Sequence, residues 1–143
     1  MTSAMATDAP GTYVLVMELP APATMEIGAL GPLVFTSGSY AYVGSAMNGL
    51  RQRIARHLRW DKKTHWHIDY LLREAAVTRV WHALHEQREC DIAAALAASF
   101  DAVEGFGCSD CRCRSHLFYG SQAAFAHALE ALGLSSSLPE EWR

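Results

Sequence analysis

The stretch from Tyr40 to His57 reads Y-A-Y-V-G-S-A-M-N-G-L-R-Q-R-I-A-R-H, and it decides how the rest of the chain is interpreted. Tyr40 and Tyr42 alternate with small apolar residues, so a strand here places both phenols on one face of a sheet. Gly44 is expected to end that strand. Asn48 is a suitable N-cap for a following helix. The stretch therefore predicts a strand, a turn and a helix in that order.

The predicted helix carries its apolar residues four positions apart, at Leu50, Ile54 and Leu58. This spacing gives the helix one buried stripe. Arg53 and His57 lie next to each other on one flank of that stripe. Arg56 and Arg59 are expected to point toward solvent. Together, the strand and the helix direct phenols and a guanidinium at one place.

The length of 143 residues fits one domain, in which roughly 68–70% of the unfolded surface can be buried. No run of residues approaches the roughly 18 consecutive apolar residues of a membrane helix. Residues 1–10 have neither the basic nor the apolar segment of a signal peptide, so a short disordered leader and a cytoplasmic protein are expected. We expect residues 11–134 to form the domain and residues 135–143 a weakly structured tail.

The net charge of −3 argues against a uniformly basic nucleic-acid binder, but the charges are unevenly distributed. Residues 1–50 contain no lysine or arginine. Six basic residues fall between positions 51 and 63, namely Arg51, Arg53, Arg56, Arg59, Lys62 and Lys63. Such a basic patch suits a phosphate backbone, although an ordinary solvated helix face has the same composition. The partner expected from this patch is DNA, and no membrane partner is expected.

The rest of the chain alternates strands and helices. β-Branched and aromatic residues predict a strand over 11–19, and glycines and a proline divide 25–37 into short strands joined by turns. Apolar spacing predicts helices over 64–76, over 87–100 and from residue 121, with strands over 77–84 and 116–119. This order predicts an α/β (α+β) fold, in which a small central antiparallel or mixed sheet is flanked by helices.

Four short motifs follow one another along these elements. They are Gly11-Thr12-Tyr13, Tyr42-Val43-Gly44, Arg53-Ile54-x-x-His57 and a glutamate, Glu89, that opens a later helix. This ordered combination resembles the GIY-YIG nuclease superfamily, and residues 11 to about 119 are similar to its Uri-type (GIY-YIG-like) branch of small prokaryotic proteins. The gap from Tyr13 to Tyr42 is longer than is usual in that superfamily. An added hairpin between the first two core strands would explain the difference.

The resemblance implies a metal-dependent phosphodiesterase, and specifically a DNA endonuclease acting on structured or single-stranded DNA. Glu89 is then expected to hold one divalent cation, Mg²⁺ or Mn²⁺. Arg53 is expected to bind the scissile phosphate. Tyr13 or Tyr42 would orient or deprotonate the attacking water, and His57 would shuttle a proton or bind phosphate.

Each of these residues also has an ordinary structural interpretation. A strand tyrosine is most often a residue of the core edge, and Tyr40 is expected to be one. His57 can be a hydrogen-bonded structural histidine, and Glu89 can simply favour the helix dipole. The alternative function is therefore a non-catalytic nucleic-acid-binding module on the same fold.

Two clusters of histidine and cysteine remain. The first offers soft ligands to one Zn²⁺ ion from Cys90, Cys108, Cys111, Cys113 and His116. A zinc-stabilised interaction domain and reduced thiols without metal are both compatible with its irregular spacing. In the second, the stretch from His65 to Asp69 is expected to cap the second helix, with His65 or His67 contacting phosphate near Lys62 and Lys63, although a metal pair of His65 with Asp69 remains possible.

Overall fold

The computed structural model describes residues 8–108 and 112–143. Within them the chain forms a six-stranded sheet, in the order β6-β7-β4-β1-β5-β8, and a separate two-stranded hairpin, β2-β3. All neighbouring strands are antiparallel. The strands are β1 (Gly11–Leu19), β2 (Ala23–Glu26), β3 (Pro32–Phe35), β4 (Gly38–Ala46), β5 (Ala76–Leu84), β6 (Asp101–Ala102), β7 (Leu117–Gly120) and β8 (Ser135–Ser137). The predicted fold class and the added hairpin between the first two core strands are confirmed.

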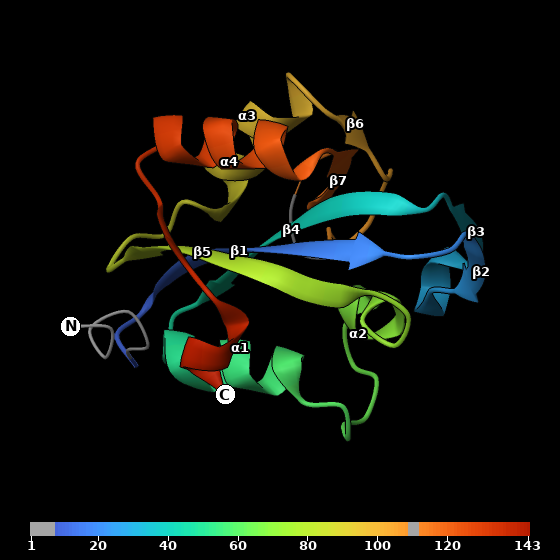
Figure 1. The fold of residues 1–143 in the computed structure, drawn as a ribbon, viewed down its shortest axis with the longest axis horizontal. Coiled ribbons are helices and arrows are strands. Elements are labelled where there is room, and N and C mark those ends of the chain that lie inside the picture. Colours follow the sequence, from blue (N-terminus) through green and yellow to red (C-terminus); the bar gives the residue numbers. More distant parts are fainter. Residues whose placement is uncertain (1–7, 109–111) are drawn as a thin grey trace.

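Helices cover both faces of the sheet (Figure 1). One face carries α1 (Leu50–Leu58) and α2 (His67–Leu71), and the other carries α3 (Glu89–Ala97) and α4 (Gln122–Ala131). Two short 3₁₀ helices complete the described elements, η2 (Gly28–Leu30) and η3 (Pro139–Trp142). Each face of the sheet packs against its helices through a separate cluster of buried apolar side chains. The sheet is therefore the middle layer of three.

The strand β1 is central, and both of its faces are buried. Tyr13, Leu15 and Met17 belong to the core on the α1 and α2 side, whereas Val14 and Val16 belong to the core on the α3 and α4 side. This alternation is the period-two pattern of a strand, and β-branched and aromatic residues suit such a pleated, buried surface. The predicted strand over 11–19 is thus confirmed.

The strand β4 places Tyr40 and Tyr42 in the core on the α1 and α2 side, as their spacing predicts. The prediction that Gly44 ends this strand is wrong, because Gly44 pairs with Tyr13 of β1 and the strand continues to Ala46. Tyr40 is a structural residue, as expected. It is buried, and its hydroxyl group donates a hydrogen bond to a backbone carbonyl of the preceding turn.

The two helices on the α1 side begin and end differently from the predictions. Gly49, not Asn48, precedes α1, and its φ of 129° is a value that favours glycine. The second helix spans only residues 67–71 instead of 64–76. Its apolar spacing continues, but Ala76 already pairs with Glu18 of β1. Tertiary strand pairing therefore overrides the helical pattern.

The last nine residues are ordered, contrary to the expected weakly structured tail. The strand β8 pairs with β5 along residues 135–137. Trp142 of η3 is fully buried against the core on the α1 side, and its indole N–H donates a 2.8 Å hydrogen bond to Oγ of Ser137. The expected leader lies mainly in residues 1–7, outside the described residues. The last residues of the expected leader are bound to the domain. The carbonyl oxygen of Ala9 accepts a hydrogen bond from the backbone N–H of Leu50, and that of Pro10 accepts one from His85.

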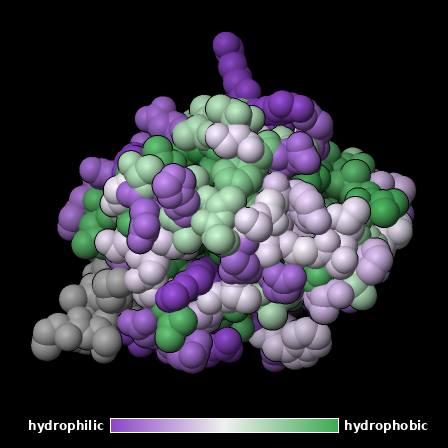
Figure 2. Space-filling view, turned by 45° about the horizontal axis from the view of Figure 1, so that its top comes forward, coloured by the Kyte–Doolittle hydropathy of each residue, from purple (hydrophilic) through white to green (hydrophobic). Residues whose placement is uncertain are grey.

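The surface is mixed in polarity. Figure 2 shows hydrophobic side chains gathered at the end of the molecule where the β2-β3 hairpin lies, and Val34 of β3 is 77% exposed. Among the described residues, no helix is long and apolar enough to cross a membrane.

Candidate active site

One cleft of about 240 Å³ opens where β1, β4 and the first turns of α1 and α3 meet. Its walls combine phenols, imidazoles, one guanidinium and one carboxylate. The lining residues are Tyr13, Tyr42, Gly44, Ser45, Arg53, His65, Trp66, His67, Glu89 and Gly107. The cleft therefore collects four of the five predicted catalytic residues, and the fifth, His57, lies directly behind Tyr13.

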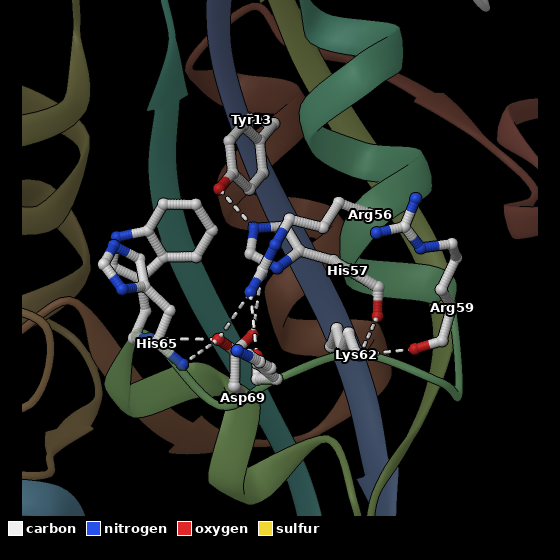
Figure 3. Close-up of polar contacts among 9 residues, drawn as sticks. Tyr13, Arg56, His57, Arg59, Lys62, His65 and Asp69 are labelled. Atoms are coloured by element: carbon white, nitrogen blue, oxygen red, sulfur yellow. Dashed lines mark hydrogen bonds and ion pairs between the residues drawn. The ribbon is translucent and has the colours of Figure 1, made fainter.

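Tyr13 and His57 form a buried pair (Figure 3). The hydroxyl oxygen of Tyr13 lies 2.7 Å from Nε2 of His57. Burial lowers the pKa of His57 to about 3 and raises the pKa of Tyr13 well above its usual value. Both groups are therefore neutral near pH 7, and they share one hydrogen bond. Nδ1 of His57 has no hydrogen-bond partner among the described residues.

A glycine opposite Tyr13 makes room for this pair. Gly44 faces Tyr13 across β1 and β4, and a Cβ atom at Gly44 would lie 2.4 Å from the hydroxyl oxygen of Tyr13. Such an approach is far inside van der Waals contact. Any other residue at position 44 would therefore displace the phenol from the floor of the cleft.

Tyr42 supplies the second phenol of the cleft, two residues before Gly44 on β4. Its ring centroid lies 6.2 Å from that of His57. Burial raises the pKa of Tyr42 well above its usual value, the neighbouring Tyr13 and Glu89 raise it further, and the nearby Arg53 guanidinium opposes them. Tyr42 is thus a neutral phenol at neutral pH.

The Arg53 side chain is fixed from two directions. Its Nη1 atom donates a 3.0 Å hydrogen bond to the backbone carbonyl of Ser45, and its Cζ atom lies 4.6 Å from the ring centroid of Trp66. A guanidinium at this distance from an indole is held by a cation–π contact. Arg53 is half-buried, so its charge faces the cleft with part of its hydrogen-bonding capacity left for a ligand.

Arg56 does not point freely toward solvent, contrary to prediction (Figure 3). Its guanidinium binds both carboxylate oxygens of Asp69, at 3.0 and 3.1 Å, and its Cζ atom lies 4.4 Å from the ring centroid of Trp66. Asp69 also accepts the backbone N–H groups of His65 and Trp66. Burial raises the pKa of Asp69, but these hydrogen bonds and the Arg56 charge lower it by more, so the carboxylate is ionised. The predicted capping of α2 in this stretch is thus confirmed, with Asp69 as the acceptor.

Glu89 is the only carboxylate among the residues that line the cleft. Its Oε1 atom accepts a 3.1 Å hydrogen bond from the Ser45 hydroxyl, and its Oε2 atom lies 3.1 Å from Nδ1 of His116. Burial raises the pKa of Glu89, but its contacts with His116 and Ser45 and the nearby Arg53 charge lower it by more. Glu89 therefore presents an ionised carboxylate from the first turn of α3.

The remaining predicted nucleic-acid contacts fall into two groups. Arg51, Arg59 and Lys63 have exposed side chains, whereas the ammonium group of Lys62 donates hydrogen bonds to two backbone carbonyls at the end of α1 (Figure 3). His65 and His67 line the cleft. Nδ1 of His67 accepts the backbone N–H of Gly107 at 2.8 Å, which fixes this ring on the cleft wall.

A second polar cluster lies beside Glu89. One potential ligand atom from each of Cys90, Cys113 and His116 lies within 4.8 Å of the others, so these three residues could hold a metal ion. Cys108 is not part of this group, and its thiol lies 3.3 Å from the carbonyl oxygen of Phe106. Cys111 lies outside the described residues. Of the five predicted zinc ligands, the described residues therefore bring together three, Cys90, Cys113 and His116.

Sequence reasoning missed the residues that support this site. Ser45 contacts both Arg53 and Glu89, Trp66 contacts two guanidinium groups, and Asp69 binds Arg56. A tryptophan and an aspartate beside a run of basic residues are a detectable signal of such pairing. Ser45 gives no such signal, because its role depends on the backbone extending beyond Gly44.

The fold and the cleft define a small α+β protein with a tyrosine–histidine pair, an arginine and a glutamate around one cavity. A family model described as "Domain of unknown function DUF123" matches residues 12–135. The chain belongs to this family. No curated protein and no solved structure matched the chain.

Proposed function

We propose that this protein is a metal-dependent endonuclease that hydrolyses phosphodiester bonds in DNA, as the resemblance of its motifs to the GIY-YIG nucleases implies. One observation carries the proposal. Tyr13, Arg53 and Glu89 come from β1, α1 and α3, far apart in the sequence, and they line the same small cleft. Phosphodiester hydrolysis needs a phosphate-binding cation, a metal-binding carboxylate and a proton acceptor, and these residues supply that set.

Arg53 is proposed to bind the scissile phosphate. Its position is fixed by the Ser45 carbonyl and the face of Trp66, so the guanidinium needs little reorganisation when the substrate arrives. A charge-assisted hydrogen bond to a phosphate oxygen is worth about 1.5–3 kcal/mol. Ser45 links this group to Glu89, because its backbone carbonyl accepts from Arg53 and its hydroxyl donates to the carboxylate.

Glu89 is proposed to hold Mg²⁺ or Mn²⁺. The residues present fit such an ion: the carboxylate is ionised, and Mg²⁺ favours one or two carboxylates together with waters and substrate oxygens. When bound, the ion would supply charge stabilisation at the phosphoryl and leaving oxygens. The oxygen ligands that Glu89 leaves open would come from water and from the phosphate.

Tyr13, rather than Tyr42, is proposed as the proton acceptor, because Tyr13 is the phenol hydrogen-bonded to His57. As water attacks phosphorus, the Tyr13 oxygen takes the water proton, and the leaving oxygen takes a proton from solvent as its bond to phosphorus breaks. The proton that Tyr13 carried passes to Nε2 of His57. The phenol stays neutral throughout, so its high pKa is not an obstacle. Burial and the nearby charges of Arg53, Arg56 and Lys62 disfavour the resulting imidazolium, while the Asp69 carboxylate favours it.

The surroundings of the cleft suit a nucleic acid. Trp60 is 82% exposed and borders a second groove, about 1220 Å³ in volume. Its charged lining is mixed, with the cations Arg59, Lys62, Arg73 and Arg143 beside the carboxylates of Glu18, Asp61, Asp69 and Glu74. Exposed aromatic rings among cations are typical of surfaces on which single-stranded bases stack. We propose that single-stranded segments, alone or in branched DNA, are the preferred substrates.

The test is a cleavage assay on single-stranded, duplex and branched DNA in Mg²⁺ or Mn²⁺. Wild type should cleave at least one of these substrates, and Arg53→Lys should lose about 10²-fold in rate, because lysine cannot reproduce the planar guanidinium. Arg79→Lys is the matched control, since Arg79 is exposed on β5 and does not line the cleft. Equal rates for Arg53→Lys and wild type would contradict the proposal.

A second candidate function is a non-catalytic nucleic-acid-binding module on the same fold. The exposed cations Arg51, Arg59 and Lys63 favour it, because they need no chemistry to hold a phosphate backbone. DNA binding that weakens steeply with salt, in the absence of any metal-dependent cleavage, would support this candidate over the first.

A further inference from the structure

We infer that Cys90, Cys113 and His116 bind one Zn²⁺ ion, which clamps the first turn of α3 to the segment that precedes β7. The three ligand atoms lie within 4.8 Å of one another. Tetrahedral zinc with bonds of about 2.0–2.3 Å separates its ligands by roughly 3.5–3.8 Å. Cys90 is exposed at the start of α3, so its side chain has room to adjust toward the ion.

The donor set selects the metal. Two thiolates and an imidazole are soft to borderline ligands that favour zinc, whereas Mg²⁺ and Ca²⁺ require oxygen. Three protein ligands leave a fourth position for water or another donor. The site is therefore chemically distinct from the oxygen site proposed at Glu89, although the two lie side by side.

The environment of His116 is a second and independent sign of a metal ligand. Its Nδ1 atom lies 3.1 Å from Oε2 of Glu89. Ligand histidines commonly have a carboxylate beside one ring nitrogen, which orients the ring while the other nitrogen binds the metal. The His116 backbone is also fixed, because its N–H donates to Phe106 and its carbonyl accepts from Val43. The ring is thus held in place before any metal binds.

The test equilibrates the full chain with Zn²⁺, removes unbound metal and measures zinc per chain by mass spectrometry. Wild type and Cys108→Ser should each retain one zinc ion, and Cys90→Ser and Cys113→Ser should lose it. Cys108→Ser is the matched control, because Cys108 is a neighbouring cysteine outside the cluster. With Co²⁺ in place of Zn²⁺, the same two proteins should show a thiolate-to-cobalt absorption band. Zinc retained by Cys90→Ser, or none retained by wild type, would overturn the inference.

Thermal melting gives a second readout. Free zinc at about 100 times its Kd should raise the melting temperature of wild type and of Cys108→Ser by about 5–10 °C. Cys90→Ser should melt near metal-free wild type and show no response to zinc. Because Cys90 is exposed, its serine variant should fold normally. A zinc response in Cys90→Ser equal to that of wild type would also overturn the inference.

A consequence for catalysis rests on the proposed function. With zinc on Nε2, His116 becomes a positioning residue that holds the Glu89 carboxylate toward the cleft. Loss of such an outer contact typically costs 10–100-fold in metal affinity. Cys90→Ser should therefore need about 10-fold more Mg²⁺ for half-maximal cleavage, whereas Cys108→Ser should not. Zinc binding in a chain that cleaves nothing would contradict the proposed function and leave the zinc site standing.

Discussion

The Tyr13 hydroxyl oxygen shares a 2.7 Å hydrogen bond with Nε2 of a neutral, buried His57. The pair joins β1 to α1 beneath the cleft, and it gives the phenol an acceptor for its proton. Tyr13 and Tyr42 occupy equivalent positions in the alternating patterns of their strands. The structure, and not the sequence, therefore distinguishes their roles.

Removal of the Tyr13 hydroxyl should slow cleavage without unfolding the protein. In Tyr13→Phe the ring remains and only the proton acceptor is lost, so the rate should fall about 10²–10⁴-fold. Tyr40→Phe is the matched control, because its buried hydroxyl bonds to a backbone carbonyl outside the cleft. Single-turnover kinetics on both variants measure the effect. An unchanged rate in Tyr13→Phe would assign the base to Tyr42 or to another group.

Gly44→Ala should be destabilising, because its Cβ atom would meet the Tyr13 phenol at 2.4 Å. Overpacking of this kind typically costs about 1–3 kcal/mol in the free energy of unfolding. The double variant Gly44→Ala/Tyr13→Ala removes the clash, so the effect of Gly44→Ala should be smaller in the Tyr13→Ala background. Urea denaturation of the four proteins measures this coupling. Additive effects would show that the two side chains do not compete for space.

Asp69→Ala should lower stability by about 3 kcal/mol, because it leaves Arg56 and two backbone N–H groups without their buried acceptor. Asp61→Ala, at an exposed position in the loop that precedes α2, should change stability little. Denaturant unfolding followed by circular dichroism compares the two variants. Equal stability of both variants would mean that the Asp69 network does not hold the loop that carries Trp66.

Stability should decrease as the pH falls below about 6.5. Burial lowers the pKa of His57 to about 3 and also lowers that of His82, whereas an unfolded histidine has its usual value near 6.5. Between pH 6.5 and pH 3 the unfolded chain therefore binds more protons than the folded chain, and protonation favours unfolding. For His57 the slope approaches about 1.4 kcal/mol per pH unit in the middle of this window, where the unfolded histidine is protonated and the folded one is not.

His57→Gln isolates the contribution of one histidine to that slope. The variant removes the titrating group but keeps a side chain that can accept from Tyr13, so its unfolding free energy should vary less with pH than that of wild type. Denaturation from pH 7 to pH 4.5 gives the comparison. An identical pH dependence in the two proteins would mean that His57 is not held neutral by burial.

The sequence predicted those parts of the fold whose signals are local. The strand β1 was predicted because nine consecutive residues suit a buried strand, and α3 because its apolar spacing coincides with Glu89 in its first turn. The extra length of α2 was predicted wrongly, because apolar residues recur past residue 71 while the backbone is already directed toward β5. The ordered C-terminus was missed, because β8 consists of three serines and Trp142 finds its pocket only in the folded protein.

The candidate site divides in the same way. Tyr13, Tyr42, Arg53 and Glu89 were recognised from residue type and order, and all four line one cleft. Their partners were not recognised, because Ser45, Trp66 and His116 act through contacts that depend on how the strands and loops pack. Residue chemistry thus indicated the groups of the site, whereas tertiary packing determines which of them touch.

The most direct test of metal-dependent hydrolysis compares Glu89→Gln with Glu86→Gln. Glu86 is an exposed glutamate three residues earlier, outside the cleft, and the same isosteric change there controls for the loss of charge. Single-turnover cleavage of single-stranded and branched DNA is measured across a Mg²⁺ titration. Wild type and Glu86→Gln should show the same Mg²⁺-dependent cleavage, and Glu89→Gln should fall at least about 10²-fold. Cleavage by Glu89→Gln at the wild-type rate, or none by wild type in Mg²⁺ or Mn²⁺, would contradict the proposed nuclease.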